Sequence, residues 1–315
     1  MNREPQMDVL DADVPDAATQ VTAAVSPPAA QNTPSTAPLI TGRSIGDFIR
    51  EACQLSAEQV EQVLAHQREH GVMFGEAAVA LNMTTSDVVM WALSQQFRYP
   101  YSAEGKDKLN AELVVAREPF SEQAELFRAV RAQMARKLQA LPQRAALAVV
   151  SPDSGDGKTY FAANLALAFS QLGRRTLLVD ADLRNPRQHE VFGIDNSQGL
   201  SAALAGRQAR VVQPLAGMPT LSVVSAGTLP PNPLELVEHT AFAALMQDLI
   251  AQYDHVIVDT PALSHGADAT VIAARCGAAL AIARQGRSKI DTLKDLVAML
   301  REDATQVLGV LVTQH

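Results

Sequence analysis

The 315-residue sequence is poor in several residue types, and each shortage excludes a class of protein. Its two cysteines, Cys53 and Cys276, lie in separate apolar segments, which excludes a disulfide-stapled scaffold and predicts buried, reduced thiols. Lysine and arginine number 26 against 34 acidic residues, and no basic stripe stands out, so general binding to nucleic acid is not expected. The seven histidines have no metal-ligand spacing.

Long apolar runs are also missing. No segment approaches the length of a membrane span, and the first residues lack the basic and apolar regions of a secretion signal. We therefore expect a cytoplasmic chain whose membrane role, if any, comes through a partner. The hydrophobic fraction of 47% is ample for a packed core, and the length leaves room for an α/β domain and a smaller unit.

Shifts in composition predict four segments. Residues 1–40 are rich in Ala, Pro, Thr, Ser and Asp and have few large apolar groups, which is typical of a disordered arm. Residues 41–101 are expected to form a small helical domain, and residues 102–118 a linker. Residues 119–315 are expected to form the main domain.

The small domain contains an internal repeat. Ile45-Gly46-Asp47 recurs 29 positions later as Phe74-Gly75-Glu76. In each copy a Ser/Thr cap with an acid behind it, at Ser56 and Thr85, then signals a second helix. Neither copy could bury its apolar face alone, so we expect the two to pack together.

The strongest motif lies within residues 145–187. Small and β-branched apolar residues at 145–150 predict a buried strand, a turn-rich loop follows, and Lys158-Thr159 open a segment with helical periodicity. This order indicates a phosphate-binding loop, although Pro152 replaces the usual first glycine. The candidate nucleotide-binding residues are Ser154, Gly155, Asp156, Gly157, Lys158, Thr159 and Tyr160.

Two further predicted strands end in acidic residues. Residues 176–179 lead into Asp180-Ala181-Asp182, and residues 255–258 lead into Asp259. Ligands bind at the carboxyl ends of strands in open α/β sheets, where such acids need a cation or solvent. We expect Lys158 to reach the β- and γ-phosphates of a nucleotide, Thr159 to ligate Mg²⁺, and Asp259 to supply a carboxylate near the metal.

The rest of the chain alternates between the two kinds of element. Apolar runs at 221–224, 278–282 and 307–312 alternate with helical patterns near 241–252, 268–275 and 289–301. The sequence therefore predicts the α/β class, with a doubly wound, mostly parallel sheet in a P-loop ATPase domain. Before it, residues 120–141 have the pattern of an amphipathic helix.

These motifs resemble the bacterial tyrosine kinases of polysaccharide export, which are deviant P-loop ATPases. Four segments carry the resemblance: LLVDADLRNPR at 177–187, GLSAALAGR at 199–207, LSVVSAGTLPPNPLELV at 221–237 and HVIVDTP at 255–261. Partition and division-site-positioning ATPases have a signature lysine where this chain has Asp153, which favours the kinase branch. The resemblance covers about residues 119–315.

The resemblance implies a protein-tyrosine kinase that uses ATP and Mg²⁺ in exopolysaccharide assembly. Its expected partner is the cytoplasmic tail of a membrane-bound chain-length determinant, which would hold the chain at the inner membrane. Lys158, Asp180 and Asp182 are the catalytic set: Asp180 would activate the incoming hydroxyl, while Asp182 and Asp259 would organise Mg²⁺. The alternative for Asp180 is that it is one more group around the metal.

Two other features follow from the resemblance. The family joins subunits into a ring through Glu-x-x-Arg-x-x-Arg, which Glu125, Arg128 and Arg131 reproduce, so a homo-oligomer is expected. Relatives often phosphorylate a C-terminal tyrosine cluster that is missing here, where the tyrosines are Tyr99, Tyr101, Tyr160 and Tyr253. Either another protein is the target, or the chain is a switch ATPase of the partition type without a protein substrate.

The repeat domain resembles the N-terminal domain of pilus and type II secretion ATPases, some of which bind cyclic di-GMP. In that pattern an arginine stands two places before the glycine of each copy, where this chain has Ser44 and Met73. A packing or docking module is therefore favoured, with dinucleotide binding as the alternative.

Overall fold

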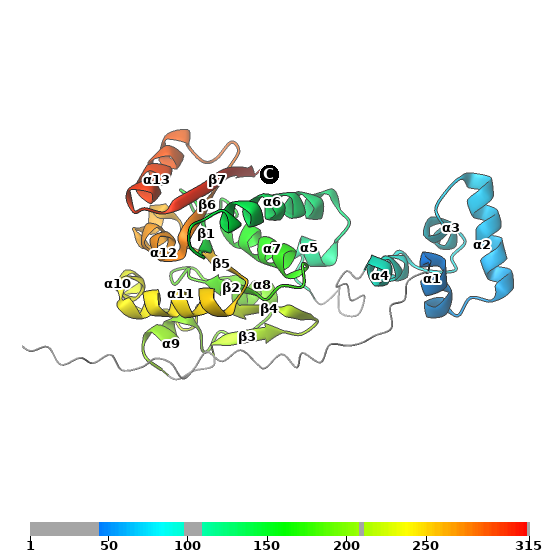
Figure 1. The fold of residues 1–315 in the computed structure, drawn as a ribbon, viewed down its shortest axis with the longest axis horizontal. Helices are drawn as coiled ribbons and strands as arrows, with labels where there is room; N and C mark the ends of the chain where they lie inside the picture. The colour runs from blue at the N-terminus through cyan, green and yellow to red at the C-terminus, as the bar shows by residue number, and fades with distance from the viewer. Residues whose placement is uncertain (1–43, 98–108, 208–210, 314–315) are drawn as a thin grey trace, which may run out of the picture.

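The computed structural model describes residues 44–97, 109–207 and 211–313. They form a small helical unit and a larger α/β unit (Figure 1). The arm predicted at 1–40 lies outside the described residues, as do Tyr99 and Tyr101. No helix in the described ranges is long and apolar enough to cross a membrane.

The helical unit consists of the two copies of the repeat. Its helices are α1 (Ile45–Cys53), α2 (Ala57–His70), α3 (Phe74–Ala80) and α4 (Ser86–Phe97). Capping boxes at Ser44 and Ser56 begin α1 and α2, because each serine oxygen accepts a bond from the backbone of the third residue beyond it. The copies interlock: α1 packs on α4 and α2 on α3, around Ile49, Ala77 and Ala92.

The α/β unit is built on one seven-stranded sheet in the order β3-β4-β2-β5-β1-β6-β7. Every neighbouring pair is parallel except β3 and β4. The strands are β1 (Ala146–Val150), β2 (Thr176–Asp180), β3 (Val212–Leu215), β4 (Met218–Val224), β5 (His255–Asp259), β6 (Gly277–Arg284) and β7 (Gln306–Thr313).

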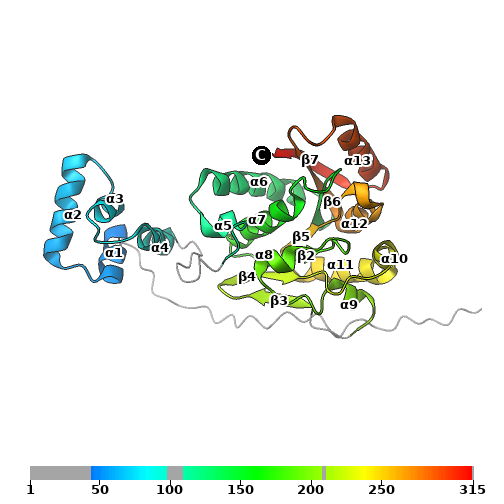
Figure 2. The same cartoon turned by 180° about the vertical axis from the view of Figure 1, so that it is seen from behind.

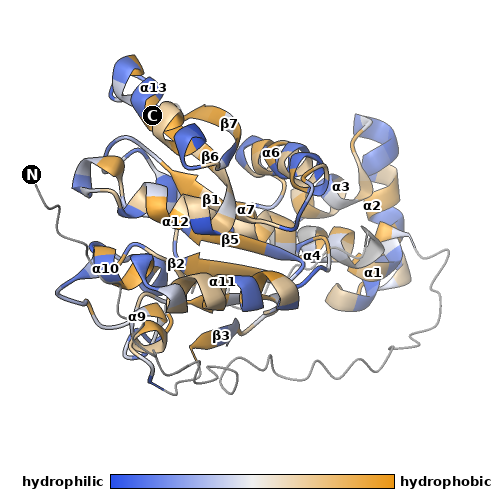
Figure 3. Ribbon diagram, turned by 60° about the vertical axis from the view of Figure 1, so that its left-hand side comes forward, coloured by the Kyte–Doolittle hydropathy of each residue, from blue (hydrophilic) through white to orange (hydrophobic). Residues whose placement is uncertain are grey.

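Helices cover both faces of the sheet, as the front and back views show (Figures 1 and 2). Successive side chains of β1 point to opposite faces of the sheet, so they belong to two separate parts of the core. Leu147 and Val149 pack with α5 (Val114–Arg117), α6 (Glu122–Gln139) and α7 (Lys158–Ser170). Ala146, Ala148 and Val150 face the other layer, which includes α11 (Thr240–Gln252), α12 (Asp268–Cys276) and α13 (Ile290–Glu302). The apolar strands between the layers are plain in Figure 3. The predicted doubly wound α/β class is confirmed.

Several short elements were not predicted. They are strand β3, helices α8 (Gln188–Phe192), α9 (Leu200–Leu204) and α10 (Pro233–Glu238), and the 3₁₀ turn Leu263–His265.

The first residue of the GLSAALAGR segment, Gly199, must be a glycine for a steric reason. A Cβ on Gly199 would lie 2.2 Å from the carbonyl oxygen of Ser225, so the backbone can approach this closely only without a side chain.

The predicted linker 102–118 is wrong for residues 109–118. Leu113 and Val115 are fully buried in the α6–α7 side of the core, and the backbone N–H of Val115 donates to the Asn164 side chain of α7 at 3.0 Å. Asn164 in turn donates to the Glu112 carbonyl at 2.7 Å. This segment therefore belongs to the α/β unit, because a buried helix supplies it with both apolar contacts and hydrogen bonds.

Candidate active site

The loop between β1 and α7 has the backbone of a phosphate-binding loop. Gly155 and Gly157 have φ values of +83° and +95°, which residues with a side chain rarely adopt. Gly157 is the N-cap residue of α7, so the free N–H groups of the first helical turn point into the loop. Asp156 stabilises the loop from inside: its carboxylate accepts bonds from the Asp153 N–H at 3.0 Å and the Ser288 hydroxyl at 2.9 Å.

Lys158 begins α7 and lies almost entirely inside the loop. Its side chain is 7% exposed, and its Nζ donates to the Ser151 hydroxyl at 2.9 Å. Burial lowers the pKa of Lys158, and the charges of Asp259 and Asp182 partly offset that effect. The charges that act most strongly on the lysine therefore come from the acidic strand ends, and its contact with the β- and γ-phosphates stays a prediction.

The acidic strand ends meet at one edge of the sheet. β2 and β5 are neighbours whose register pairs Asp180 with Asp259, and β1 lies on the other side of β5. Asp180 and Asp259 are fully buried and Asp182 is 8% exposed. The structure therefore brings the phosphate loop and all three acids together, as expected for the carboxyl edge of a parallel sheet.

The loop after β2 wraps around the first two acids. Asp180 accepts backbone N–H bonds from Asp182, Arg187 and Gln188 at 3.2, 3.2 and 3.0 Å. Asp182 accepts backbone N–H bonds from Arg184 and Asn185 at 3.1 and 2.8 Å, and both bonds end on its Oδ1. Both carboxylates consequently have fixed orientations.

Burial dominates the electrostatics of the two innermost acids. It raises the pKa of Asp180 well above its ordinary value, and the neighbouring charge of Asp259 adds to the rise. It also raises the pKa of Asp259 to about 6, although the Lys158 ammonium counteracts it. Two buried carboxylates whose charged forms are disfavoured in this way favour a cation beside them.

The residues fit a magnesium ion that a nucleotide helps to hold. Asp259 Oδ1 is buried and has no hydrogen-bond partner at normal distance among the described residues, although the nearby Thr159 side chain lowers the pKa of this carboxyl, so Oδ1 is an acceptor available to a metal or its water. No group of three or more His, Cys, Asp or Glu side chains in the described ranges could hold a metal alone. This combination suits Mg²⁺, which uses one or two carboxylates together with phosphate oxygens and waters.

Three residues at the end of β6 and just beyond it were missed by the sequence interpretation. Arg287 donates to the Ser154 carbonyl at 3.0 Å, and its guanidinium nitrogen lies 2.9 Å from the point where a Cβ on Gly155 would be. Arg284 reaches the Gly155 carbonyl at 3.4 Å, and Ser288 holds Asp156 as described above. They close one side of the phosphate loop from a segment more than a hundred residues away, and no local pattern indicates that approach.

Tyr160 does not face the loop. Its hydroxyl accepts a bond from the Gln123 side chain at 2.8 Å, and its ring packs edge-on against Phe127 of α6.

The charged residues predicted to join subunits also lie on α6. Arg128 contacts Glu125 at 2.6 Å and donates to the Pro119 carbonyl, while Arg131 donates to the Ala168 carbonyl at 3.0 Å. The two arginines are therefore bonded to their own chain.

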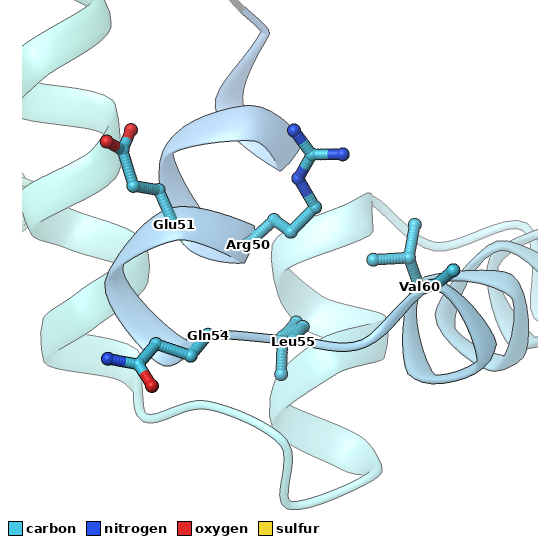
Figure 4. A pocket seen from close by; sticks show the side chains of 6 residues that line it. Arg50, Glu51, Gln54, Leu55 and Val60 are labelled. Carbon is cyan, nitrogen blue, oxygen red and sulfur yellow. The ribbon is translucent and has the colours of Figure 1, made fainter.

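The helical unit has a separate open pocket between α1 and α2 (Figure 4). Arg50, Gln54, Leu55 and Val60 are among its lining residues. Ser44 and Met73, at the positions compared with arginines, are the N-cap residues of α1 and α3. Both positions therefore start helices.

Comparison with known proteins supports the nucleotide-binding interpretation. Residues 147–315 match the CobQ/CobB/MinD/ParA nucleotide binding domain. The chain is 30% identical over 213 residues to "Putative tyrosine-protein kinase CapB" of Staphylococcus aureus, covering 64% of this chain and 89% of that protein. It is 36% identical over 164 residues to the correspondingly named EpsB of Ralstonia nicotianae, covering 52% of this chain. The match spans only 22% of EpsB, about a fifth of its length.

Solved structures agree with these relatives. The kinase domain of the Escherichia coli tyrosine kinase ETK superposes with a TM-score of 0.61 at 27% identity, covering 67% of this chain and 86% of that domain. The chimerical protein CapA2B2 gives a TM-score of 0.60 at 29% identity, with 70% and 96% covered. The chain therefore belongs to the CobQ/CobB/MinD/ParA nucleotide-binding family and, within it, to the bacterial tyrosine kinases.

Proposed function

We propose that this chain is a protein-tyrosine kinase that uses ATP and Mg²⁺ and acts in exopolysaccharide assembly. The observation that carries the proposal is the meeting of Lys158, Asp180 and Asp259 at one sheet edge beside a glycine loop. Phosphoryl transfer needs mainly alignment and charge neutralisation, and this edge offers both.

Each site residue has a proposed role. The N–H groups of residues 154–159 bind the β- and γ-phosphates, and Lys158 neutralises their charge. Thr159, Asp182 and Asp259 would hold Mg²⁺, which supplies charge stabilisation at the transferred phosphoryl group. The raised pKa of Asp180 suits the acceptor of the tyrosine proton. Because Asp180 is fully buried beneath the loop at 182–188, which donates three backbone N–H bonds to it, taking that proton requires this loop to shift.

The test is mass spectrometry for phosphotyrosine after incubation with Mg-ATP, alone and with membranes, beside the Lys158→Ala variant. We expect phosphotyrosine that depends on Lys158. Tyr253 is 5% exposed and Tyr160 is held on α6, so modification is expected at Tyr99 or Tyr101, or on another protein. ATP hydrolysis without any phosphotyrosine would instead favour the switch ATPase.

The proposed partner is the cytoplasmic tail of a membrane-bound chain-length determinant, which would place the chain at the inner membrane. For the helical unit we propose docking. The side chain of Ser44 is already used in capping α1, which disfavours cyclic di-GMP at that position.

Self-association through Glu125, Arg128 and Arg131 is the proposed assembly mode. We expect a concentration-dependent increase in mass by light scattering for the wild-type chain, abolished by the double change Arg128→Ala and Arg131→Ala. Arg136→Ala, an exposed change in the last turn of the same helix, is the matched control and should leave the mass unchanged. A monomer at every concentration, in all three proteins, would contradict this mode.

A further inference from the structure

Gln188 is a fully buried residue that joins three parts of the candidate active site. Its side-chain Nε2 donates to the Thr159 carbonyl at 3.1 Å and to Asp259 Oδ2 at 2.9 Å. Its backbone N–H donates to Asp180 Oδ2 at 3.0 Å. One residue thus contacts the start of α7, the end of β2 and the end of β5.

The orientation of the Gln188 amide follows from its partners. One atom of the Gln188 amide contacts both the Thr159 carbonyl and the Asp259 carboxylate. Because both of these partners are hydrogen-bond acceptors, that atom must be the amide nitrogen. The amide oxygen, Oε1, is then left buried without a partner among the described residues, and so is Asp259 Oδ1. Two orphaned acceptors on two side chains that share a hydrogen bond are costly unless a donor or cation approaches them.

We propose that Gln188 is a positioning residue for the magnesium site of the proposed kinase. Its amide N–H fixes one oxygen of Asp259, which leaves Oδ1 to face the metal or a metal-bound water. The bond to the Thr159 carbonyl ties this carboxylate to the residue whose hydroxyl is the other proposed ligand. The unpartnered Oε1 would be available as an acceptor when the site holds hydrated Mg²⁺. This inference rests on the proposed function, and no motif read from the sequence included Gln188.

The test measures the affinity for Mg²⁺ separately from that for the nucleotide. Isothermal titration calorimetry gives ADP binding in EDTA, and then the apparent Kd of Mg²⁺ in the presence of ADP. Gln188→Met keeps the length of the side chain without its polar atoms, and Gln188→Glu replaces the donor by an acceptor. The control is Gln171→Met, because Gln171 also donates one bond to a backbone carbonyl, that of Val115, and also has an orphaned oxygen.

We expect Gln188→Met and Gln188→Glu to bind Mg²⁺ at least about 10-fold more weakly, with metal-free ADP affinity within twofold of wild type. Gln171→Met should match wild type in both. An unchanged Mg²⁺ affinity in Gln188→Met would overturn the proposal, and so would loss of metal-free ADP binding in both Gln188 variants, which would assign the residue to folding. A wild-type chain that binds ADP without any effect of Mg²⁺ would instead overturn the metal site itself, and this inference with it.

Discussion

Lys158→Ala is expected to reduce ATP turnover and tyrosine phosphorylation by about 10²- to 10³-fold or more. The ammonium group is held inside the phosphate loop by Ser151, so no other cation of this loop can take its place at the same point. Removing it also withdraws the charge that counteracts the raised pKa of Asp259. The measurement is initial rates of phosphate release and phosphotyrosine formation at saturating ATP.

A matched lysine controls for nonspecific effects of charge. Lys294 is exposed on α13 and contacts Asp291 at 3.9 Å on the surface, so Lys294→Ala should keep wild-type rates. Retention of more than a tenth of wild-type turnover by Lys158→Ala would rule out the role given to this residue.

Asp259→Asn is expected to abolish Mg-dependent turnover while leaving the nucleotide-free protein as stable as wild type, or more stable, at pH 7. The amide oxygen can accept the Gln188 bond, and the amide nitrogen would take the place of the orphaned Oδ1. A buried charge is removed without the loss of a hydrogen bond. We expect a gain on the order of 1 kcal/mol in the free energy of unfolding, measured by urea denaturation.

In Asp259→Asn the free energy of unfolding should also depend less on pH than in the wild type. Because the pKa of Asp259 is raised to about 6, the folded wild type binds more protons than the unfolded chain between about pH 4 and pH 6. The raised pKa of Asp259 leaves the free energy of unfolding unchanged below this window and lowers it by its full amount above the window. The stability of the wild type should therefore fall as pH rises through the window. Asp259→Asn should show a flatter profile; an equal slope in both proteins would contradict the assignment.

Asp180→Asn is the informative contrast. Asp180 accepts N–H bonds on both oxygens, so an amide nitrogen would have to face at least one N–H donor. We expect this variant to lose about 1–3 kcal/mol in the free energy of unfolding, where Asp259→Asn loses none.

The sequence was sufficient for the parts of the site that lie at the ends of local patterns. Asp180 and Asp259 each end a short apolar run, Lys158 follows the glycine loop after another such run, and parallel strands bring these ends to one edge. The strands themselves were predictable because their apolar runs are bounded by turn residues or acids. The confirmed α/β class depends on this alternation alone.

Features that depend on contacts between distant segments were not predictable. Arg287 reaches the phosphate loop from beyond β6, and Gln188 is polar in a segment without periodicity. Leu113 and Val115 were assigned to a linker because four helical residues are too few to show a pattern. Their burial comes from α7, whose residues are apolar on nearly every side.

The carbonyl partners of Arg128 and Arg131 have a thermodynamic consequence for assembly. Each guanidinium already donates to its own backbone, at Pro119 and Ala168. An arginine has five N–H donors, so it can keep such a bond while it donates to a second group. In the proposed assembly these intrachain bonds would hold each guanidinium in one orientation before a second subunit arrives, which reduces the side-chain entropy lost when the interface forms.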